Sequence, residues 1–557
     1  MDNSMNEFNY NENLPSEEEI EEDAERRSMY TFGIYKIARV EDKKFWMMAI
    51  VFGLISYVFS IMKDLKDTFV IVRQIPASIH FLKLFYIPPI AILGTILIQK
   101  ALVDSDNKSI LMRMLLGFAV FYFLFAMVSL PLPFPVEINT DGLKDTFADG
   151  KMKYKGTESI LALLLTFYSW TSTVLFISSE IFGTLVLSLL FLSFANDICP
   201  INEFLRFLPL LYTISNLSLI LSSISLYHIS NFLNTFSYRN GRVMFSCLFI
   251  ILSGLCLVAY FCTVILDRSV LSKPIFIVDG PQKKKSKQKI SFNEGFKLMF
   301  TSKLVLSICL IVLFYNISQN MVDSSYKSLL RVEAERLGKN ESFVINNQWR
   351  SQMTTGIGSI ILLITPFSKI VRTAGWIVAG MITPIYVGVG CSFVFILAVY
   401  NTSILGKNGI EYLNGFVQAN RIIHSILNSD DAFLTFKYEV IIGRYISAGF
   451  KIIKYASFDI CKEAISMKIN PNCRSRFKGV YDGICSKLGK SMGAMLSILM
   501  TMVFSTTDVR EASIFYFLFS TVIVLVWVFV VIYLGKKYND SVTNNSYIDI
   551  DLFQKTA

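Results

Sequence analysis

The sequence has little charge for its length. Only 17% of its 557 residues are charged, whereas soluble domains carry about a quarter. At the same time 53% of the residues are hydrophobic, among them 47 phenylalanines. Stretches of roughly 20 apolar residues, enough to cross about 30 Å of hydrocarbon, recur along the chain. The composition therefore excludes a soluble protein and predicts an all-α polytopic membrane protein.

Residues that carry metal and enzyme chemistry are scarce. His80, His228 and His424 are too scattered to predict a metal site, and none of the nine cysteines forms a CxxC pair, so we interpret them as small core residues. The stretch "LGKS" at 488–491 has Ile484 where a phosphate-binding loop requires glycine. We therefore expect no metal, no cofactor, no ATP hydrolysis and no enzymatic activity.

The apolar stretches predict about twelve membrane-spanning helices. The fourth is long enough to contain a kink or two shorter helices. The predicted segments are 45–72, 79–103, 109–132, 158–197, 202–229, 241–266, 303–327, 350–371, 373–399, 432–462, 480–504 and 513–535.

A lysine-rich stretch divides these helices into six and six. Cytoplasmic loops retain an excess of lysine and arginine, so we expect this stretch and, with an even number of helices, both termini in the cytosol. Its lysines are Lys283, Lys284, Lys285, Lys287 and Lys289. Two six-helix bundles resemble the major facilitator architecture, which binds its substrate near the midplane. The expected domains are an acidic disordered tail over 1–40, bundles over 41–266 and 303–537, a basic linker over 267–302, and a C-terminal tail over 538–557.

Several ionisable residues lie inside the apolar segments. Such a group costs at least about 2.5–3.5 kcal/mol at the bilayer centre, so it faces a partner or a water-filled cavity. Glu180 is the only charged residue between positions 159 and 196. Lys66 lies in "MKDLKDTFVIV" just before apolar sequence resumes, and Asp323 follows Asn320 in the seventh segment. These residues are candidates for a binding site between the bundles.

Lysines recur on one face of the tenth segment. Lys451, Lys454 and Lys462 fall within an arc of roughly 80° at about 100° per residue, and Lys487 and Lys490 follow in the eleventh segment. Like charges on one face require an anion or acidic partners. The alternative, that these lysines reach the cytosolic interface or pair with acids, remains open. The nearby acids are Asp459, Glu463 and Asp482.

Four stretches have a recognisable pattern, in the order "LKDTFVIV", "SSEIFGTLVLSLLFLSFANDI", "KYASFDICKE" and "FKGVYDGICSKLGKSMG". The first two resemble a first-helix Lys-Asp segment and a segment that runs from Glu-Leu-Trp-Gly to Phe-Ala-Asn. The others resemble Lys-Tyr-x-x-Phe-Asp-Pro-Cys-Lys-Glu, followed by Lys-Gly-Lys-x-x-x-Asp and Gly-Lys-Ser-Gly-Gly. All four are similar to the plastid and intracellular-parasite ATP/ADP translocase family. The matches spread from about 66 to 493, most of the membrane portion.

The resemblance implies a twelve-helix antiporter that exchanges ATP for ADP and imports host ATP across the cell membrane of an intracellular parasite. The family's residues needed for transport correspond to Lys66, Glu180 and Lys462, with Asp323 where the family usually has glutamate. We interpret the two lysines, one from each half, as phosphate ligands that the two acids hold when the site is empty. Further substrate-binding candidates are Lys454, Lys490 and Asn320.

Two other classes of function remain open. A major-facilitator-like, proton-coupled carrier of another solute would use Glu180 and Asp323 as proton sites, and relatives of the family carry other nucleotides. A membrane enzyme or lipid scramblase is the third class, without a recognisable catalytic constellation to support it. For all three we expect a monomer in the lipid bilayer with no nucleic-acid partner.

Overall fold

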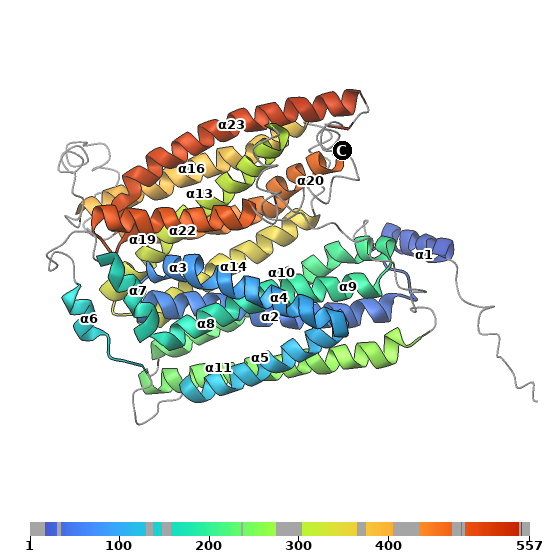
Figure 1. Cartoon of the computed structure of the whole chain (residues 1–557), viewed down its shortest axis with the longest axis horizontal. Coiled ribbons are helices and arrows are strands. Elements are labelled where there is room, and N and C mark those ends of the chain that lie inside the picture. The colour runs from blue at the N-terminus through green and yellow to red at the C-terminus, as the bar shows by residue number, and fades with distance from the viewer. Residues whose placement is uncertain are drawn as a thin grey trace, which may run out of the picture.

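The computed structural model shows an elongated assembly of long helices that run side by side (Figure 1). It describes residues 17–30, 35–129, 137–147, 158–235, 238–273, 303–364, 375–404, 434–469, 481, 485–544 and 547–548. Within these ranges the regular elements are helices and no strand occurs. The predicted class, an all-α polytopic membrane protein, is confirmed.

Six membrane-length stretches form the N-terminal half. They are α2 (Asp42–Arg73), α3 with η1 and α4 (Ser78–Phe81, Leu82–Tyr86, Ile87–Asp104), α5 (Asn107–Ser129), α7 and α8 with η2 and α9 (Glu158–Tyr168, Trp170–Ile181, Phe182–Phe191, Leu192–Ile198), α10 (Ile201–Thr235), and α11 with η3 (Tyr238–Leu266, Asp267–Leu271). The short α6 (Asp141–Thr146) lies between α5 and α7. Ser169, with φ −95° and ψ 57°, separates α7 from α8. This break is the interruption that the length of the fourth segment predicts.

Six further stretches form the C-terminal half. They are α13 (Lys303–Arg336), α14 (Asn340–Ile364), α16 (Trp376–Ile404), α19 with η5 and α20 (Leu434–Ile453, Lys454–Phe458, Asp459–Met467), α22 (Ser486–Phe504), and η7 with α23 (Val509–Ala512, Ser513–Thr543). Helix α14 begins at Asn340 rather than at 350 because its polar first turns pack against protein instead of lipid. The lysines at 283–289 and the acid Asp482 lie outside the described residues.

Polarity separates the helices into two kinds. Among the described residues, nine helices are long and apolar enough to cross a membrane by length and composition. The stretches that fall short are α14, α19 with η5 and α20, and α22, which carry amides and lysines along their length. A helix with so many polar side chains is stable at membrane depth only where it faces protein or a water-filled cavity.

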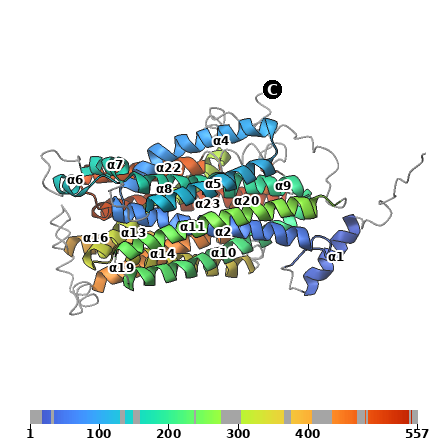
Figure 2. The ribbon, with the colours of Figure 1, turned by 90° about the horizontal axis from the view of Figure 1, so that it is seen from below.

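Each half has its own apolar core. One core gathers buried side chains such as Phe45, Phe52 and Phe182 from the N-terminal half, and a second gathers others such as Tyr315 and Trp527 from the C-terminal half. Figure 1 shows the blue-to-green helices below and the yellow-to-red helices above, with α14 between them. The view from below shows the same helices running nearly parallel along the long axis (Figure 2). The molecule therefore consists of two helical bundles.

Small residues allow close contact where helices of the interface meet. A Cβ atom on Gly356 of α14 would lie 2.7 Å from Ile220 Cγ1 and 3.3 Å from the carbonyl oxygen of Asn216, both on α10. A Cβ atom on Gly493 of α22 would lie 2.8 Å from the Cβ atom of Asn320 on α13. Glycine at these positions lets two backbones approach without a lipid layer between them.

The acidic N-terminal segment is ordered over part of its length. Residues Glu17–Tyr30 form helix α1, so the expectation of a disordered tail over 1–40 is wrong for this stretch. Ala24 is 1% exposed, and Arg27 Nη1 donates hydrogen bonds to the carbonyl oxygen of Ile37 and to Asp42 Oδ1, each at 2.9 Å. The hydrogen bond to Asp42 raises the pKa of Arg27 above its usual value. Helix α1 is held at the beginning of α2 because one of its faces packs there.

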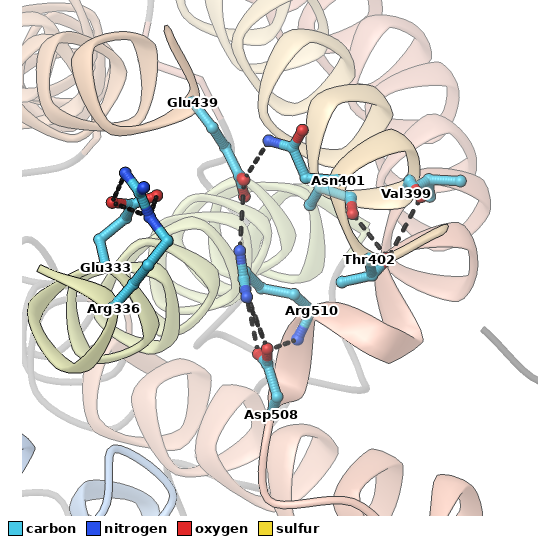
Figure 3. A network of polar contacts seen from close by, with 9 residues as sticks. Glu333, Arg336, Val399, Asn401, Thr402, Glu439, Asp508 and Arg510 are labelled. Atoms are coloured by element: carbon cyan, nitrogen blue, oxygen red, sulfur yellow. Dashed lines mark hydrogen bonds and ion pairs between the residues drawn. The ribbon is translucent and has the colours of Figure 1, made fainter. Parts of the chain in front are cut away.

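A buried ionic network lies in the C-terminal half (Figure 3). The side chain of Arg510 in η7 is fully buried. Its guanidinium donates to Asp508 Oδ2 at 2.7 Å and to Glu439 Oε2 at 3.2 Å. Asn401 Nδ2 donates to the same Glu439 oxygen at 2.6 Å. The network joins α16, α19 and the turn before α23 at one end of the bundle.

Candidate functional site

The predicted partners Lys66 and Glu180 meet between helices α2 and α8. Lys66 is only 3% exposed. Its Nζ lies 2.9 Å from Glu180 Oε1 and 3.0 Å from Asp67 Oδ1, and 3.8 Å from the ring centroid of Phe176. The buried ammonium is thus held by two carboxylates and an aromatic face. This is the pairing of the empty site that the sequence predicts for Lys66.

The same cluster joins the two halves of the protein. Asp67 Oδ2 lies 2.8 Å from Nζ of Lys327 on α13, so one carboxylate contacts a lysine from each half. On the same side of α2, Thr68 Oγ1 donates to Gln348 Oε1 of α14 at 2.8 Å. We name Lys66, Asp67, Glu180 and Lys327 the Lys66 cluster. Lys327 is one of the residues that the sequence analysis does not select.

Asp323 and Asn320 lie on α13 close to this cluster. Asp323 Oδ1 accepts a hydrogen bond from Ser447 Oγ of α19 at 2.5 Å. Asn320 Nδ2 donates to the carbonyl oxygen of Lys490 on α22 at 2.9 Å. Both side chains also line a small hollow between the halves. Helix α3 contributes His80 to this hollow, and η1 contributes Lys83. The amide and the carboxylate therefore belong to the interface, as the sequence predicts, although the carboxylate meets a serine and not a lysine.

The hollow is small. The side chains that line it leave almost no free space for even a water-sized molecule. Room for a nucleotide therefore requires the two halves to move apart.

Lys490 and Lys454 lie near each other, although they come from different helices. Lys490 is close enough to interact electrostatically with Lys454, with Glu180 and with Lys66. Lys454 begins η5, a turn of π-helix between α19 and α20. Such turns are rare and occur frequently at functional sites. The two lysines extend the positive surface of the Lys66 cluster along the interface.

Lys462 lies deeper in the C-terminal half than expected. It is 9% exposed, and its Nζ lies 3.0 Å from Asp459 Oδ1, one turn earlier on α20. The rings of Phe458 and Tyr481 lie 5.7 and 5.9 Å from this Nζ. The expectation that Glu180 or Asp323 holds Lys462 in the empty site is therefore wrong for this conformation. The acid that pairs with it is one that the sequence offers as an alternative partner.

Helix register explains why Lys462 and Lys66 do not meet. Phe458 stacks on Tyr315 of α13 with ring centroids 4.9 Å apart, and Lys462 is one turn beyond Phe458 towards the linker. Lys327, which belongs to the Lys66 cluster, is about 12 residues along α13 in the opposite direction. At 1.5 Å per residue Lys462 and Lys327 are roughly 24 Å apart along the helix axes. A phosphate group that contacts the Lys66 cluster at Lys327 therefore does not also reach Lys462 in this conformation.

Lys83 is a further interface lysine that the sequence analysis does not select. It lies in η1, a second π-helical turn, and lines the hollow together with Lys327. It interacts electrostatically with Lys66, Asp67 and Asp323. Between positions 78 and 99 it is the only charged residue, which is the same signal that identifies Glu180.

Among the described residues of the interface, lysines outnumber carboxylates. Lys451 and Asp64 belong to the same region, because Lys451 interacts electrostatically with Asp323 and Asp64 interacts with Lys66. The set contains eight lysines and four carboxylates, an excess of four positive charges: Lys63, Lys66, Lys83, Lys327, Lys451, Lys454, Lys487 and Lys490, with Asp64, Asp67, Glu180 and Asp323. A ligand with about three to four negative charges matches this excess, and lysine ammonium groups are compact, mobile partners for phosphate. Within the described residues no group of His, Cys, Asp and Glu is arranged to hold a metal ion.

Comparison with known proteins gives the family. A family model described as TLC ATP/ADP transporter matches residues 20–538. ADP,ATP carrier protein 1 of Encephalitozoon cuniculi is 37% identical over 549 residues, 98% of this chain and 95% of that protein. ADP,ATP carrier protein 1 of Paranosema grylli is 35% identical over 542 residues, 97% of this chain and 96% of that protein. A bacterial homologue of the lysosomal transporter Spinster, in an inward-facing and unoccupied conformation, has a TM-score of 0.48 at 10% identity, over 90% of this chain and 98% of that chain. The chain therefore belongs to the TLC ATP/ADP transporter family.

Proposed function

We propose that this protein exchanges ATP for ADP across a membrane by alternating access. The observation that carries the proposal is a row of lysines between the two bundles, in which Lys66 pairs with Glu180 at 2.9 Å. The row consists of Lys66, Lys83, Lys327, Lys454 and Lys490. The row has the charge and the ligand chemistry for a polyphosphate. The family is one of transporters and not of enzymes, which favours movement of the nucleotide over its hydrolysis.

Binding and conformational change are coupled through the Lys66 cluster. A nucleotide phosphate that reaches Lys66 competes with Glu180 and Asp67 for its ammonium group. When Asp67 is displaced, its contact with Lys327 at 2.8 Å is weakened as well, and that contact holds the halves together. A ligand shifts a conformational equilibrium only through different affinities for the two states. Exchange of carboxylates for phosphate oxygens supplies such a difference.

The domain division and the orientation are part of the proposal. The bundles extend over 41–266 and 303–537, and the two apolar cores support this division. The linker 267–302, the remaining N-terminal tail and the tail 538–557 lie in the cytosol, since cytoplasmic loops retain lysine and arginine. The membrane that we propose is the cell membrane of an intracellular parasite, which is the location that the resemblance of the sequence motifs implies. The transporting unit is a monomer, because the row of lysines lies between two halves of one chain.

Uptake into vesicles tests the exchange. Purified protein in liposomes loaded with ADP is expected to take up labelled ATP at least about tenfold faster than protein in empty liposomes, because the carboxylates of the empty site balance only part of its lysines and the remaining charge makes the return of the empty site costly. The control is the same liposomes without protein. Equal uptake into empty and loaded vesicles contradicts exchange. Uptake that follows a pH gradient and ignores ADP supports the proton-coupled carrier.

Lys462 is expected to act at the linker-side end of the pathway. Replacement of Lys462 by glutamine should weaken ATP and ADP transport about tenfold to a hundredfold, which corresponds to the loss of a charged hydrogen bond of about 1.5–3 kcal/mol. Lys462→Arg should not restore transport, because a planar guanidinium demands a different phosphate geometry. The measurement is the concentration dependence of nucleotide uptake.

The control for Lys462 is Lys468→Gln, just beyond the end of the same helix. It removes the same charge from a side chain that is more exposed than Lys462, and transport should stay within about twofold of the original. Normal transport by correctly inserted Lys462→Gln would assign this lysine to the membrane interface and leave Lys66 as the principal phosphate ligand.

A further inference from the structure

The hollow between the halves is lined by charged and polar side chains from both bundles. His80 and Lys83 come from α3 and η1, whereas Asn320, Asp323 and Lys327 come from α13. In this conformation the lining side chains leave almost no free space between them, so a phosphate group enters the hollow only when the halves move apart. A ligand here would touch both halves at once.

Lys83 differs from the other lysines of this region in its pairing. Lys66 and Lys327 each contact a carboxylate at 3.0 Å or less. Within the described part of the chain, no carboxylate lies within 4.0 Å of the Lys83 ammonium and no hydrogen bond from it is formed. The side chain is only partly exposed, and its neighbours include the two like charges of Lys66 and Lys327. An ammonium group in such surroundings requires an anion.

The imidazole of His80 also has an unused polar atom. The side chain is 2% exposed, and its buried Nδ1 has no hydrogen-bond partner among the described residues. Buried polar atoms are nearly always hydrogen-bonded. A ring nitrogen that carries a proton donates to an anion that enters the same hollow. Lysine and histidine therefore supply a cation and a donor to one small space.

We propose that Lys83, Lys327 and His80 form a subsite for the terminal phosphate that ATP has and ADP lacks. This inference rests on the proposed function, and it adds a residue that selects between the two nucleotides. The carboxylates Glu180 and Asp67 already balance part of the charge of Lys66 and Lys327, whereas Lys83 has no carboxylate in direct contact among the described residues and interacts with Asp67 and Asp323 only at longer range. The additional negative charge of ATP would pair with the ammonium group of Lys83. Binding there also joins α3 and η1 to α13.

Competition measurements test the subsite. The uptake of labelled ADP by Lys83→Gln is measured with unlabelled ATP or unlabelled ADP as competitor. The concentration of ATP that halves uptake should rise at least about tenfold, as expected for the loss of one charged hydrogen bond. The corresponding concentration of ADP should change less than about threefold. Lys83→Arg keeps the charge but presents a planar guanidinium, so, as for Lys462, it should not restore the preference for ATP.

Two further variants control for loss of structure. Lys100→Gln removes an exposed lysine from the end of the same continuous stretch of helix, and both competition values should stay unchanged. His80→Gln should raise the ATP value in the same direction by a smaller factor. Equal shifts for ATP and ADP, or no shift for either, would overturn the subsite. Absence of ADP uptake by the unchanged protein would instead refute the proposed exchange.

Discussion

Replacement of Lys66 by glutamine is expected to abolish measurable exchange of ATP for ADP. The ammonium group lies 2.9 Å from Glu180 and 3.0 Å from Asp67, so its removal leaves two carboxylates without their shared cation and the phosphate without a ligand. Loss of one partner from a fully buried ion pair lowers stability by up to about 3–5 kcal/mol, less here because the Glu180 side chain is 32% exposed. Loss of a charged hydrogen bond of about 1.5–3 kcal/mol to the phosphate weakens affinity roughly tenfold to a hundredfold. The measurement is uptake of labelled ATP into liposomes loaded with ADP.

A second variant separates binding from folding. In the double variant Lys66→Gln with Glu180→Gln, the uncompensated carboxylate is removed together with its partner, so thermal stability in detergent should recover towards the original value. Transport should not recover, because the phosphate ligand is still missing. Lys43→Gln on the same helix removes an exposed lysine and should have little effect on either property. Substantial exchange by the double variant would show that Lys66 has a structural role only.

The sequence predicts the Lys66 cluster in part because of one physical rule. An isolated charge in an apolar helix must face a partner, and this rule identifies Glu180 among 37 uncharged neighbours. The same rule identifies Lys83, which stands alone between positions 78 and 99. Asp67 and Lys327 are less visible, since they lie next to other charges near the ends of their apolar segments. Their contact at 2.8 Å depends on how the two bundles are placed.

The position of Lys462 depends on information that lies outside its own helix. Spacing along one helix gives the face on which a residue lies, and on this basis the sequence predicts Lys454 and Lys462 on one face. The level of that face within the bundle is set by the register between antiparallel helices. Here the register is fixed by packing of Phe458 on Tyr315 and by the hydrogen bond from the Tyr315 hydroxyl to the carbonyl oxygen of Phe450 at 2.9 Å. A single sequence does not contain this register.

The polar helices show how composition and position are related in this fold. Helix α14 is too polar to count among the nine apolar helices found in the described residues, and it packs along α10 of the opposite half. Hydrogen bonds from Gln352 Nε2 to Ser222 Oγ at 2.7 Å and from Ser230 Oγ to the carbonyl oxygen of Ser342 at 2.9 Å cross the interface. The amides and hydroxyls that exclude this helix from lipid thus allow the two halves to recognise each other.

Replacement of Arg510 by methionine is expected to produce the largest loss of stability. The guanidinium is fully buried between Asp508 and Glu439, and methionine would leave both carboxylates as uncompensated charges in the interior. We expect the free energy of unfolding to fall by about 3–5 kcal/mol, and the temperature at which the purified protein loses its monodisperse state in detergent to fall with it.

A triple replacement tests whether the lost stability comes from the carboxylates that Arg510→Met leaves unpaired. The variant combines Arg510→Met, Asp508→Asn and Glu439→Gln. It removes all three charges while keeping side chains of similar size, so most of the lost stability should return. Lys108→Gln is the matched control, since Lys108 pairs with Asp267 at 2.9 Å and both side chains are partly exposed, 26% and 37%, and an exposed pair contributes about 0–1 kcal/mol. If Arg510→Met were as stable as Lys108→Gln, the carboxylates would have to be protonated or hydrated, and the network would not be what holds α19 to the turn before α23.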